Sequence, residues 1–297
     1  MNLLFLVNPN AGHGKALKVL PKIEEYCRKQ AINYEIIRTE YPWHGIELIK
    51  NTDLSRFDGV VACGGDGTNF ELINGYFSNP LKNKPPIGIV PVGTGNAFAK
   101  DVSLENGDWE KAMNIISNGK TKQVDVMRFR TEDKDYHLLN IIGAGFVADV
   151  GATANQLKVL GEMSYILGVF YQLVKLGTFK ITLNLDGSII ERDAVFVEVA
   201  NTRYTGSIFL MAPDAKIDDG LLDIIILKEV SRRKLLKLFP TIFKGNHINY
   251  DEVEYFKAKK ISIQSDIKKT LIPDGEIMGS TPFEVECLPG SVKVFWK

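Results

Sequence analysis

The first 125 residues alternate short apolar runs with segments of helical period, and three of the apolar runs end in a glycine-rich turn. Parallel strands joined by crossover helices produce this alternation. The expected strands are Leu3–Val7, Tyr34–Arg38, Gly59–Cys63 and Ile87–Val90, and the expected helices are Gly14–Lys29, Gly45–Asn51, Thr68–Phe77 and Asp108–Ser117. We therefore predict a doubly wound α/β domain over residues 1–125.

The glycine-rich turns predict a phosphate site. They run from Asn8 to Lys15, from Gly64 to Thr68 and from Pro91 to Asn96. A doubly wound sheet binds ligands outside the carboxyl ends of its strands, where these turns fall. Glycines let backbone N–H groups approach an anion closely, and a following helix adds its positive N-terminal end. Thr68 and Thr94 offer further hydroxyl donors at the same place.

The remainder of the chain, residues 126–297, has the alternation of an antiparallel β-sandwich or barrel. Its period-two strings are Thr182–Asp186, Val195–Val199, Lys260–Gln264, Phe283–Cys287 and Val292–Trp296. Helical insertions are expected at Gln156–Leu176 and at Ser231–Phe243, with Ser231 as the N-cap. Because no long linker interrupts the chain, we expect two domains that meet in a cleft. The last strand can return to the N-terminal domain.

Bulk composition excludes several classes of protein. Lysine and arginine together number 36, as do aspartate and glutamate, so the field that draws a protein onto nucleic acid is absent. The three cysteines stand far apart, which favours buried core thiols in a reducing cytoplasm over a disulfide framework. The chain shows no signal peptide and no apolar stretch of about 18 residues, so contact with a membrane is expected to be peripheral and transient.

Two competing phosphate motifs are excluded by their spacing or context. Gly12–Ala16 lacks the four-residue gap between glycines of a P-loop and the Ser or Thr after its lysine. Gly143–Ala148 has the spacing of a dinucleotide-binding turn, but it lies in the all-β half without a surrounding βαβ unit.

Four motifs in order resemble the signature set of the diacylglycerol kinase and sphingosine kinase catalytic domain, in its compact bacterial form. They are Asn8–Gly12, Gly64–Thr68, Gly93–Asn96 and Pro273–Glu276, and they span essentially the whole chain. The second motif alone is shared with NAD kinases and phosphofructokinases. The resemblance implies an N-terminal domain similar to those kinases, with nucleotide bound between it and the β-sandwich. It also implies transfer of the γ-phosphoryl group of ATP to a membrane lipid, most readily diacylglycerol to phosphatidic acid.

The same resemblance implies roles for individual residues. Glu276 matches the general base, and Asp66 and Asp125 match acids that are candidates for the shell of a Mg²⁺ ion. In a loop from Ala212 to Asp223, the carbonyls of Lys216 and Leu221 and the carboxylate of Asp219 match a structural Mg²⁺ site. The positions that match nucleotide contacts are Asn8, Asn10, Gly12, Thr39, Gly64, Gly65, Asp66, Gly67, Thr68, Gly93, Thr94 and Asn96. Ordinary turns are the alternative reading of residues 274–276 and of the acidic loop.

One departure from the family bears on the acceptor. Ala97 stands where bacterial diacylglycerol kinases usually carry aspartate, whereas sphingosine kinases tend to have small residues there. Asp101, one helical turn on, is a candidate substitute. A sphingoid base or another lipid alcohol is therefore an alternative acceptor, and an NAD kinase or a lipid-binding regulator without catalysis is an alternative function.

Two segments could bring the protein to its lipid. Tyr165–Val174 is rich in large apolar residues, and Ser231–Phe243 combines Arg232, Arg233 and Lys234 with apolar neighbours. Such segments suit the headgroup boundary of an anionic bilayer, although a helix packed on a sheet has the same pattern. A homodimer is also left open.

Overall fold

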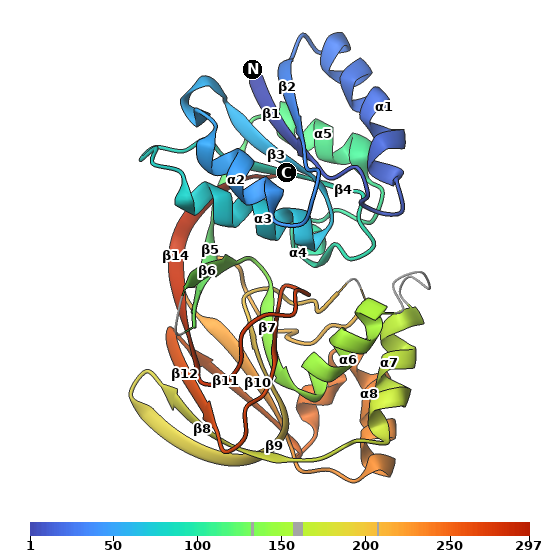
Figure 1. Ribbon diagram of the computed structural model, residues 1–297, viewed down its shortest axis with the longest axis vertical. Coiled ribbons are helices and arrows are strands. Elements are labelled where there is room, and N and C mark those ends of the chain that lie inside the picture. Colours follow the sequence, from blue (N-terminus) through green and yellow to red (C-terminus); the bar gives the residue numbers. More distant parts are fainter. Residues whose placement is uncertain (132–133, 157–162, 207) are drawn as a thin grey trace. The chain divides into compact units, whose positions relative to one another are not determined.

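The protein is described by a computed structural model that covers residues 1–131, 134–156, 163–206 and 208–297 (Figure 1). The chain divides into two compact units. Residues Met1–Val124 and Gly290–Lys297 form the first unit, and residues Asp125–Pro289 form the second. None of the helices in the described part of the chain has both the length and the apolar character needed to cross a membrane.

A parallel sheet forms the centre of the first unit. Its strands are β1 (Asn2–Val7), β2 (Asn33–Arg38), β3 (Gly59–Gly64) and β4 (Ile87–Pro91), and they stand in the order β2-β1-β3-β4. The end of the last strand of the chain, β14 (Phe283–Phe295), joins this sheet in parallel through Val294 and Ile87. The predicted α/β domain and its four strands are therefore confirmed.

Helices cover this sheet as the alternation predicted. They are α1 (Lys15–Lys29), α2 (His44–Asn51), α3 (Asp66–Ser78), α4 (Ala97–Asp101) and α5 (Trp109–Ser117), with a 3₁₀ turn η1 (Leu54–Arg56). Helices α1 and α5 lie side by side, as do α2 and α3 (Figure 1). Every residue of β3 and of β4 is buried, which a parallel sheet with helices on both faces requires.

The second unit is built from antiparallel strands. They are β5 (Thr121–Arg130, which enters from the first unit), β6 (Asp135–Leu138), β7 (Ile141–Gly145), β8 (Phe179–Leu185), β9 (Ser188–Ala200), β10 (Leu222–Lys228), β11 (Val253–Ala258), β12 (Lys260–Ser265), β13 (Leu271–Pro273) and the first part of β14. Six of them follow the order β11-β10-β9-β8-β12-β14, while β7 pairs with β9 and β13, and β5 pairs with β6 and β14. The predicted β-sandwich half is confirmed.

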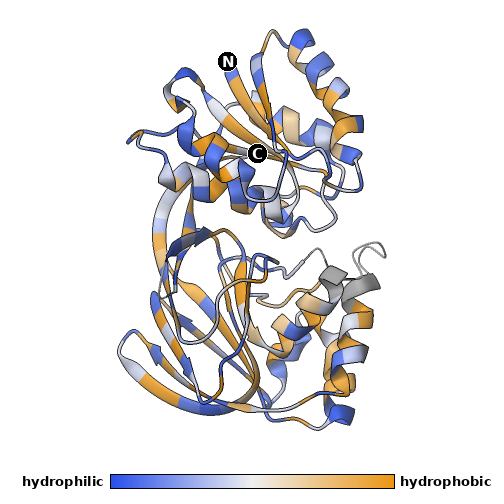
Figure 2. Ribbon diagram, in the orientation of Figure 1, coloured by the Kyte–Doolittle hydropathy of each residue, from blue (hydrophilic) through white to orange (hydrophobic). Residues whose placement is uncertain are grey.

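Helices α6 (Phe146–Gln156), α7 (Met163–Leu173) and α8 (Arg232–Ile242) belong to the second unit, with a 3₁₀ turn η3 (Asn246–Asn249). They cover one face of the sheet with an apolar layer that includes Phe146, Val169 and Leu235. In Figure 2 hydrophobic and hydrophilic colours alternate along these helices and along the strands. Ser231 caps α8 as predicted, since its hydroxyl accepts the Lys234 N–H at 3.2 Å.

Two elements differ from their predicted extents. The strings Phe283–Cys287 and Val292–Trp296 belong to one strand, β14, which continues through Pro289 and Gly290. The helical insertion predicted at Gln156–Leu176 begins earlier, at Phe146, and residues 157–162 lie outside the described part. Gly145 has a φ of +82° and lets the chain turn from β7 directly into α6, which alternation alone does not reveal.

The three cysteines are free and buried, as predicted. Burial in apolar surroundings raises the pKa of the Cys27 thiol to about 11 and that of Cys287 to about 12. These thiols therefore stay protonated and serve as core residues.

Candidate functional site

The glycine-rich turns of the first unit touch one another at the carboxyl edge of the sheet. A Cβ on Gly12 would stand 2.0 Å from the carbonyl oxygen of Val92, and a Cβ on Gly93 would stand 2.2 Å from the Cα of Gly65. Gly12 also has a φ of +58°, which disfavours other residues. Only glycine permits this approach of three backbone segments, so the predicted convergence of the turns is present in the first unit.

Hydrogen bonds lock the second turn to the third. The N–H groups of Val92 and Gly93 donate to the Gly64 carbonyl at 3.0 and 2.9 Å, and the Asp66 N–H donates to the Gly95 carbonyl at 3.2 Å. The Asp66 carboxylate accepts the Ala97 N–H with both oxygens, at 3.0 and 3.1 Å. Asp66 therefore caps the N-terminus of α4 in addition to any role toward a ligand.

The first turn is held by its asparagines. Asn8 donates its N–H to the Cys63 carbonyl at 3.2 Å, and its side-chain oxygen accepts the Asn10 N–H at 3.0 Å. Thr39 follows β2 and donates its N–H to the Val7 carbonyl at 2.9 Å. These contacts bring Asn8, Asn10 and Thr39 to the edge where the glycines meet.

Polar groups without protein partners gather behind these turns. The Thr68 hydroxyl and the Asn96 side-chain oxygen are buried and have no hydrogen-bond partner among the described residues. The Asn96 amide donates to the Gly93 carbonyl at 2.9 Å, and Thr94 is exposed at the tip of its turn. Helix α3 begins at Asp66, directly after the glycines, so its positive N-terminal end lies at the same edge. This edge can hold an anion such as a phosphate chain.

In the second unit, residues 273–276 form a turn after β13. Asp274 is buried, has a φ of +45°, and accepts three backbone N–H groups: Leu139 at 3.1 Å, Asn140 at 3.1 Å and Ile141 at 2.9 Å. The Glu276 N–H donates to the Pro273 carbonyl at 2.8 Å. The carboxylate of Glu276 is half-buried and has no hydrogen-bond or ion-pair partner in the described part of the chain. Asp274 thus anchors a turn that presents Glu276.

A buried polar network connects this turn to Asp125. The Asn201 side-chain amide donates to the carbonyls of Asp125 and Leu139, at 3.0 and 2.9 Å. The Asn201 N–H donates to the Asn140 carbonyl at 2.8 Å, next to the N–H groups that Asp274 holds. The Asp125 carboxylate accepts the Gly220 N–H at 2.7 Å. Asp125 and the segment that carries Glu276 are therefore parts of one hydrogen-bonded framework.

The sequence analysis did not identify three residues that connect this framework: Asn140, Asn201 and Asp274. Asn140, Asn201 and Asp274 are at most 5% exposed, and each lies in or beside an apolar run. A lone amide inside the run Leu138–Ile142 is the signal that could have drawn attention to Asn140, because buried polar groups are retained only with partners.

The Lys257 ammonium lies beside the loop from Ala212 to Asp223 that is predicted to bind Mg²⁺. The Asp219 carboxylate accepts the Leu221 N–H at 3.1 Å and lies 3.3 Å from the Lys257 ammonium, which is also 3.1 Å from Asp223. No cluster of three or more histidine, cysteine or acidic side chains suited to a metal occurs in the described residues. The loop would supply one carboxylate and backbone carbonyls, an all-oxygen set that suits Mg²⁺ once Lys257 releases Asp219.

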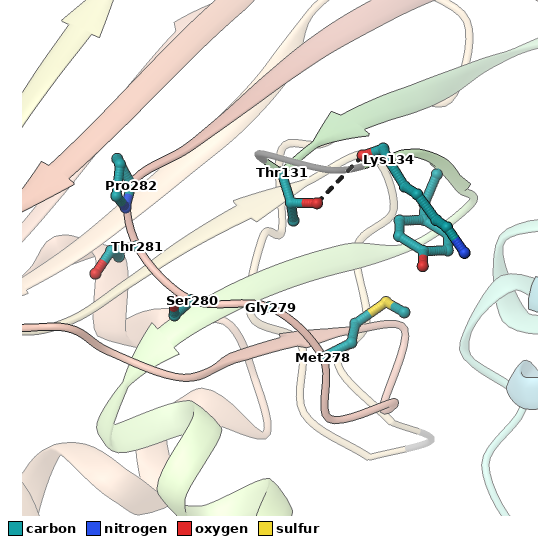
Figure 3. A pocket seen from close by; sticks show the side chains of 8 residues that line it. Thr131, Lys134, Met278, Gly279, Ser280, Thr281 and Pro282 are labelled. Atoms are coloured by element: carbon teal, nitrogen blue, oxygen red, sulfur yellow. Dashed lines mark hydrogen bonds between the residues drawn. The ribbon is translucent and has the colours of Figure 1, made fainter.

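Two of the cavities in the second unit bear on the candidate site. One, of about 350 Å³, begins two residues after Glu276, and the segment from Met278 to Pro282 faces Thr131 and Lys134 across it (Figure 3). The other is a smaller apolar cavity of about 70 Å³ between β9 and the helices α6, α7 and α8. Its lining is Phe146, Val147, Val150, Val169, Phe196, Thr205, Phe209, Met211, Leu235, Phe239 and Ile242.

Comparison with known proteins covers both halves of the chain. Residues 2–129 match the family model of the diacylglycerol kinase catalytic domain, and residues 140–296 match the YegS C-terminal NAD kinase beta sandwich-like domain. A diacylglycerol kinase of Mycobacterium tuberculosis (strain ATCC 25618 / H37Rv) is 30% identical over 292 residues, with 97% of this chain and 93% of its own length covered. A diacylglycerol kinase of Bacillus subtilis (strain 168) is 28% identical over 281 residues, with 94% and 91% covered.

Solved structures agree with this assignment. A diacylglycerol kinase from Bacillus anthracis str. Sterne matches with a TM-score of 0.80 at 28% identity, covering 100% of this chain and 97% of that one. An NAD kinase from Archaeoglobus fulgidus in complex with ATP matches with a TM-score of 0.53 at 13% identity over 99% of this chain and 93% of that one, which shows a shared fold alone. Fold and glycine-rich edge therefore define a kinase that joins an α/β domain to a β-sandwich domain. The chain belongs to the diacylglycerol kinase family and is a lipid kinase.

Proposed function

We propose that this lipid kinase uses ATP and Mg²⁺ to phosphorylate diacylglycerol, giving phosphatidic acid and ADP. In this reaction the bond from the γ-phosphorus to the oxygen of the departing ADP breaks, and a bond to the lipid hydroxyl oxygen forms. Positioning and charge stabilisation supply most of the catalysis in phosphoryl transfer. The observation that carries the proposal is the mutual contact of the three glycine-rich turns in the first unit.

The edge of the first unit would bind the triphosphate of ATP. Backbone N–H groups of the glycine-rich turns would contact phosphate oxygens, because no side chain obstructs the glycines, and the positive N-terminal end of α3 would attract them. The residues proposed to contact the nucleotide are Asn8, Asn10, Gly12, Thr39, Gly64, Gly65, Asp66, Gly67, Thr68, Gly93, Thr94 and Asn96. The unpartnered Thr68 hydroxyl supports this use of the site.

Glu276 is proposed as the general base that takes the proton of the lipid hydroxyl as the new bond forms. Its carboxylate has no partner among the described residues, so it is available to accept that proton, while Asp274 fixes the backbone that carries it. The proposal requires that Glu276 reach the acceptor hydroxyl when both substrates are bound.

Mg²⁺ would neutralise charge on the transferring phosphoryl group. Asp66 and Asp125 are the proposed carboxylates for this ion, and both already accept a backbone N–H that fixes their orientation. Lys216, Asp219 and Leu221 are proposed to hold a second, structural Mg²⁺ through two carbonyls and one carboxylate.

The apolar cavity and the exposed face of α7 support a lipid as acceptor. The cavity volume of about 70 Å³ compares with roughly 30 Å³ for one water molecule in the liquid, so an acyl chain would enter only as side chains move aside. On α7 and just beyond it, Leu167, Phe170, Tyr171 and Val174 are 41%, 52%, 59% and 73% exposed. Their spacing places them on one helical face, which suits the boundary of a bilayer.

The same helix is a better docking candidate than α8. Arg232 donates to the carbonyls of Leu173 and Val174 at 3.0 and 2.8 Å, and Lys234 pairs with Glu252 at 2.8 Å. These basic side chains therefore hold neighbouring parts of the protein. We propose peripheral membrane association through the exposed face of α7.

The acceptor is tested by incubating the protein with labelled ATP, Mg²⁺ and a whole-lipid extract in detergent, with NAD added in a parallel reaction. The proposal expects label in phosphatidic acid. Label in a phosphorylated sphingoid base or in NADP would assign a different acceptor, and no label in any product would point to a regulator without catalysis.

Docking is tested by sedimentation with anionic vesicles. Replacing Phe170, Tyr171 and Val174 with serine should release the protein from the vesicles, because these side chains supply the exposed apolar area. Replacing Arg233 and Lys237 on α8 with glutamine is the matched control. Loss of sedimentation in the control alone would transfer the docking role to α8.

A further inference from the structure

Glu198 is a charged residue type in the middle of an apolar layer. It lies on β9 and is fully buried. Alternation along the strand puts it on the same face as Phe196 and Ala200, and the antiparallel register pairs it with Ile225 of β10. Those three neighbours belong to the apolar layer beneath α6, α7 and α8. On its other side the register pairs Glu198 with Gly143 of β7, which has no side chain to offer.

The hydrogen bonding of Glu198 is incomplete. The Thr205 hydroxyl donates to Oε1 at 2.6 Å, whereas Oε2 has no partner among the described residues. Loss of hydration raises the pKa of the carboxyl to about 7, so the neutral acid is populated at physiological pH. A neutral acid carries one O–H, and because Oε1 already accepts from Thr205, that proton on Oε2 is a donor without an acceptor. Leaving such a donor unsatisfied is costly, which indicates that something else accepts it.

The surroundings of Glu198 indicate where a hydrogen-bond acceptor for its O–H would come from. Thr205 and Phe196, the hydrogen-bond partner and the strand neighbour of Glu198, both line the apolar cavity. The other lining side chains end in carbon or sulfur. The carboxyl is therefore hydrogen-bonded to Thr205, which supplies the one polar side chain in the lining of this cavity.

We propose that Glu198, supported by Thr205, donates a hydrogen bond to an ester carbonyl of the acceptor lipid and thereby selects acylated glycerols. This inference rests on the proposed function, since it assigns a specificity residue to the same lipid site. An ester carbonyl is an acceptor only, so it complements an O–H donor. The carbonyl also sits at the start of an acyl chain, where an apolar cavity with one polar group at its wall is complementary to it.

The experiment compares dioctanoylglycerol with its dioctyl ether analogue, which has the same length and hydroxyl but no carbonyl. The readout is the ratio of kcat/KM for the ester to kcat/KM for the ether. The intact protein should favour the ester by roughly tenfold, the value of one hydrogen bond to a buried group. Glu198→Leu should bring the ratio close to one, because the donor is gone. Glu198→Gln keeps shape and an N–H donor and should preserve most of the preference.

The outcomes separate this inference from the proposed function. A ratio near one in the intact protein, or a ratio that Glu198→Leu leaves unchanged, overturns the role of Glu198 while the kinase assignment stands. If neither lipid is phosphorylated, the proposed function fails, and calorimetric binding of the two lipids tests Glu198 directly: equal affinities reject it. Thr205→Val is the second variant, and it should weaken the ester preference less than Glu198→Leu does, because Thr205 acts by orienting the acid.

Discussion

Replacing Asp274 with alanine tests whether the turn that carries Glu276 is held by one buried carboxylate. Asp274 accepts the N–H groups of Leu139, Asn140 and Ile141 at 2.9 to 3.1 Å. Each buried N–H left without a partner costs about 1–3 kcal/mol. Three of them at the low end of that range give a loss of about 3 kcal/mol, and alanine at a φ of +45° adds about 1 kcal/mol.

Asp186 offers a matched control. It also has a positive φ, +51°, is also followed by a glycine, and accepts the N–H groups of Lys259 and Lys260 at 2.9 and 2.8 Å. Because Asp186 is exposed, water replaces the lost acceptor. Asp186→Ala should therefore cost only about 1 kcal/mol, mostly from the strained φ.

The assay pairs urea denaturation with lipid phosphorylation. Asp274→Ala should lower the free energy of unfolding by about 3–5 kcal/mol and lower kcat strongly, because Glu276 loses its fixed backbone, while the KM for ATP stays near that of the parent. Asp186→Ala should leave kcat unchanged. If Asp274→Ala costs no more stability than Asp186→Ala and keeps the parental kcat, the anchoring role is refuted.

Three further predictions concern the phosphate edge and the buried acid. Gly12→Ala should weaken ATP binding severely in calorimetry, because the new Cβ would stand 2.0 Å from the Val92 carbonyl oxygen. Gly14→Ala is the control: nothing lies within 4 Å of its Cβ, so it should cost about 1 kcal/mol of stability and little ATP affinity. Equal losses of ATP affinity in the two variants would contradict the packing argument. The Glu198 carboxyl has its pKa raised from 4.5 to about 7 on folding, so the folded state holds the proton more tightly and the parent should lose stability as pH rises from about 4.5 to about 7, then level off. Glu198→Gln removes this titration. Measured by urea denaturation, the free energy of unfolding of the variant relative to that of the parent should be up to about 3 kcal/mol higher at pH 8 than at pH 4. Parallel pH profiles of the two proteins would refute this prediction. Ala97→Asp adds a carboxylate to the residue whose N–H Asp66 accepts, so the Mg²⁺ concentration for half-maximal activity should fall, and unchanged kinetic constants would show that the position is silent.

Sequence reasoning succeeded where the signal is local. The apolar runs Leu3–Val7 and Gly59–Cys63 are buried on both faces, so composition alone reveals them as strands of a covered parallel sheet. The glycine turns were visible for the same reason, since each follows its strand directly. Their contact with one another was predictable because parallel strands end at one edge.

The features of the fold and the site that were not predicted depend on contacts between residues that are distant in sequence. Asp274 and Asn140 are 134 positions apart, and neither residue alone reveals that the carboxylate of one holds the backbone of the other. Glu198 looks like an outward-facing residue of an alternating strand, and only the layer of α6, α7 and α8 buries it. The start of α6 at Phe146 was likewise hidden, because it depends on the positive φ of Gly145.

The most direct test of the account is Glu276→Gln, assayed with labelled ATP and diacylglycerol alongside calorimetric titration with a non-hydrolysable ATP analogue. The account predicts that the analogue binds as it does to the parent, since the glycine-rich edge is untouched, and that kcat falls by about a hundredfold or more, the usual contribution of a positioned base. Undiminished phosphorylation by the variant would contradict the central claim.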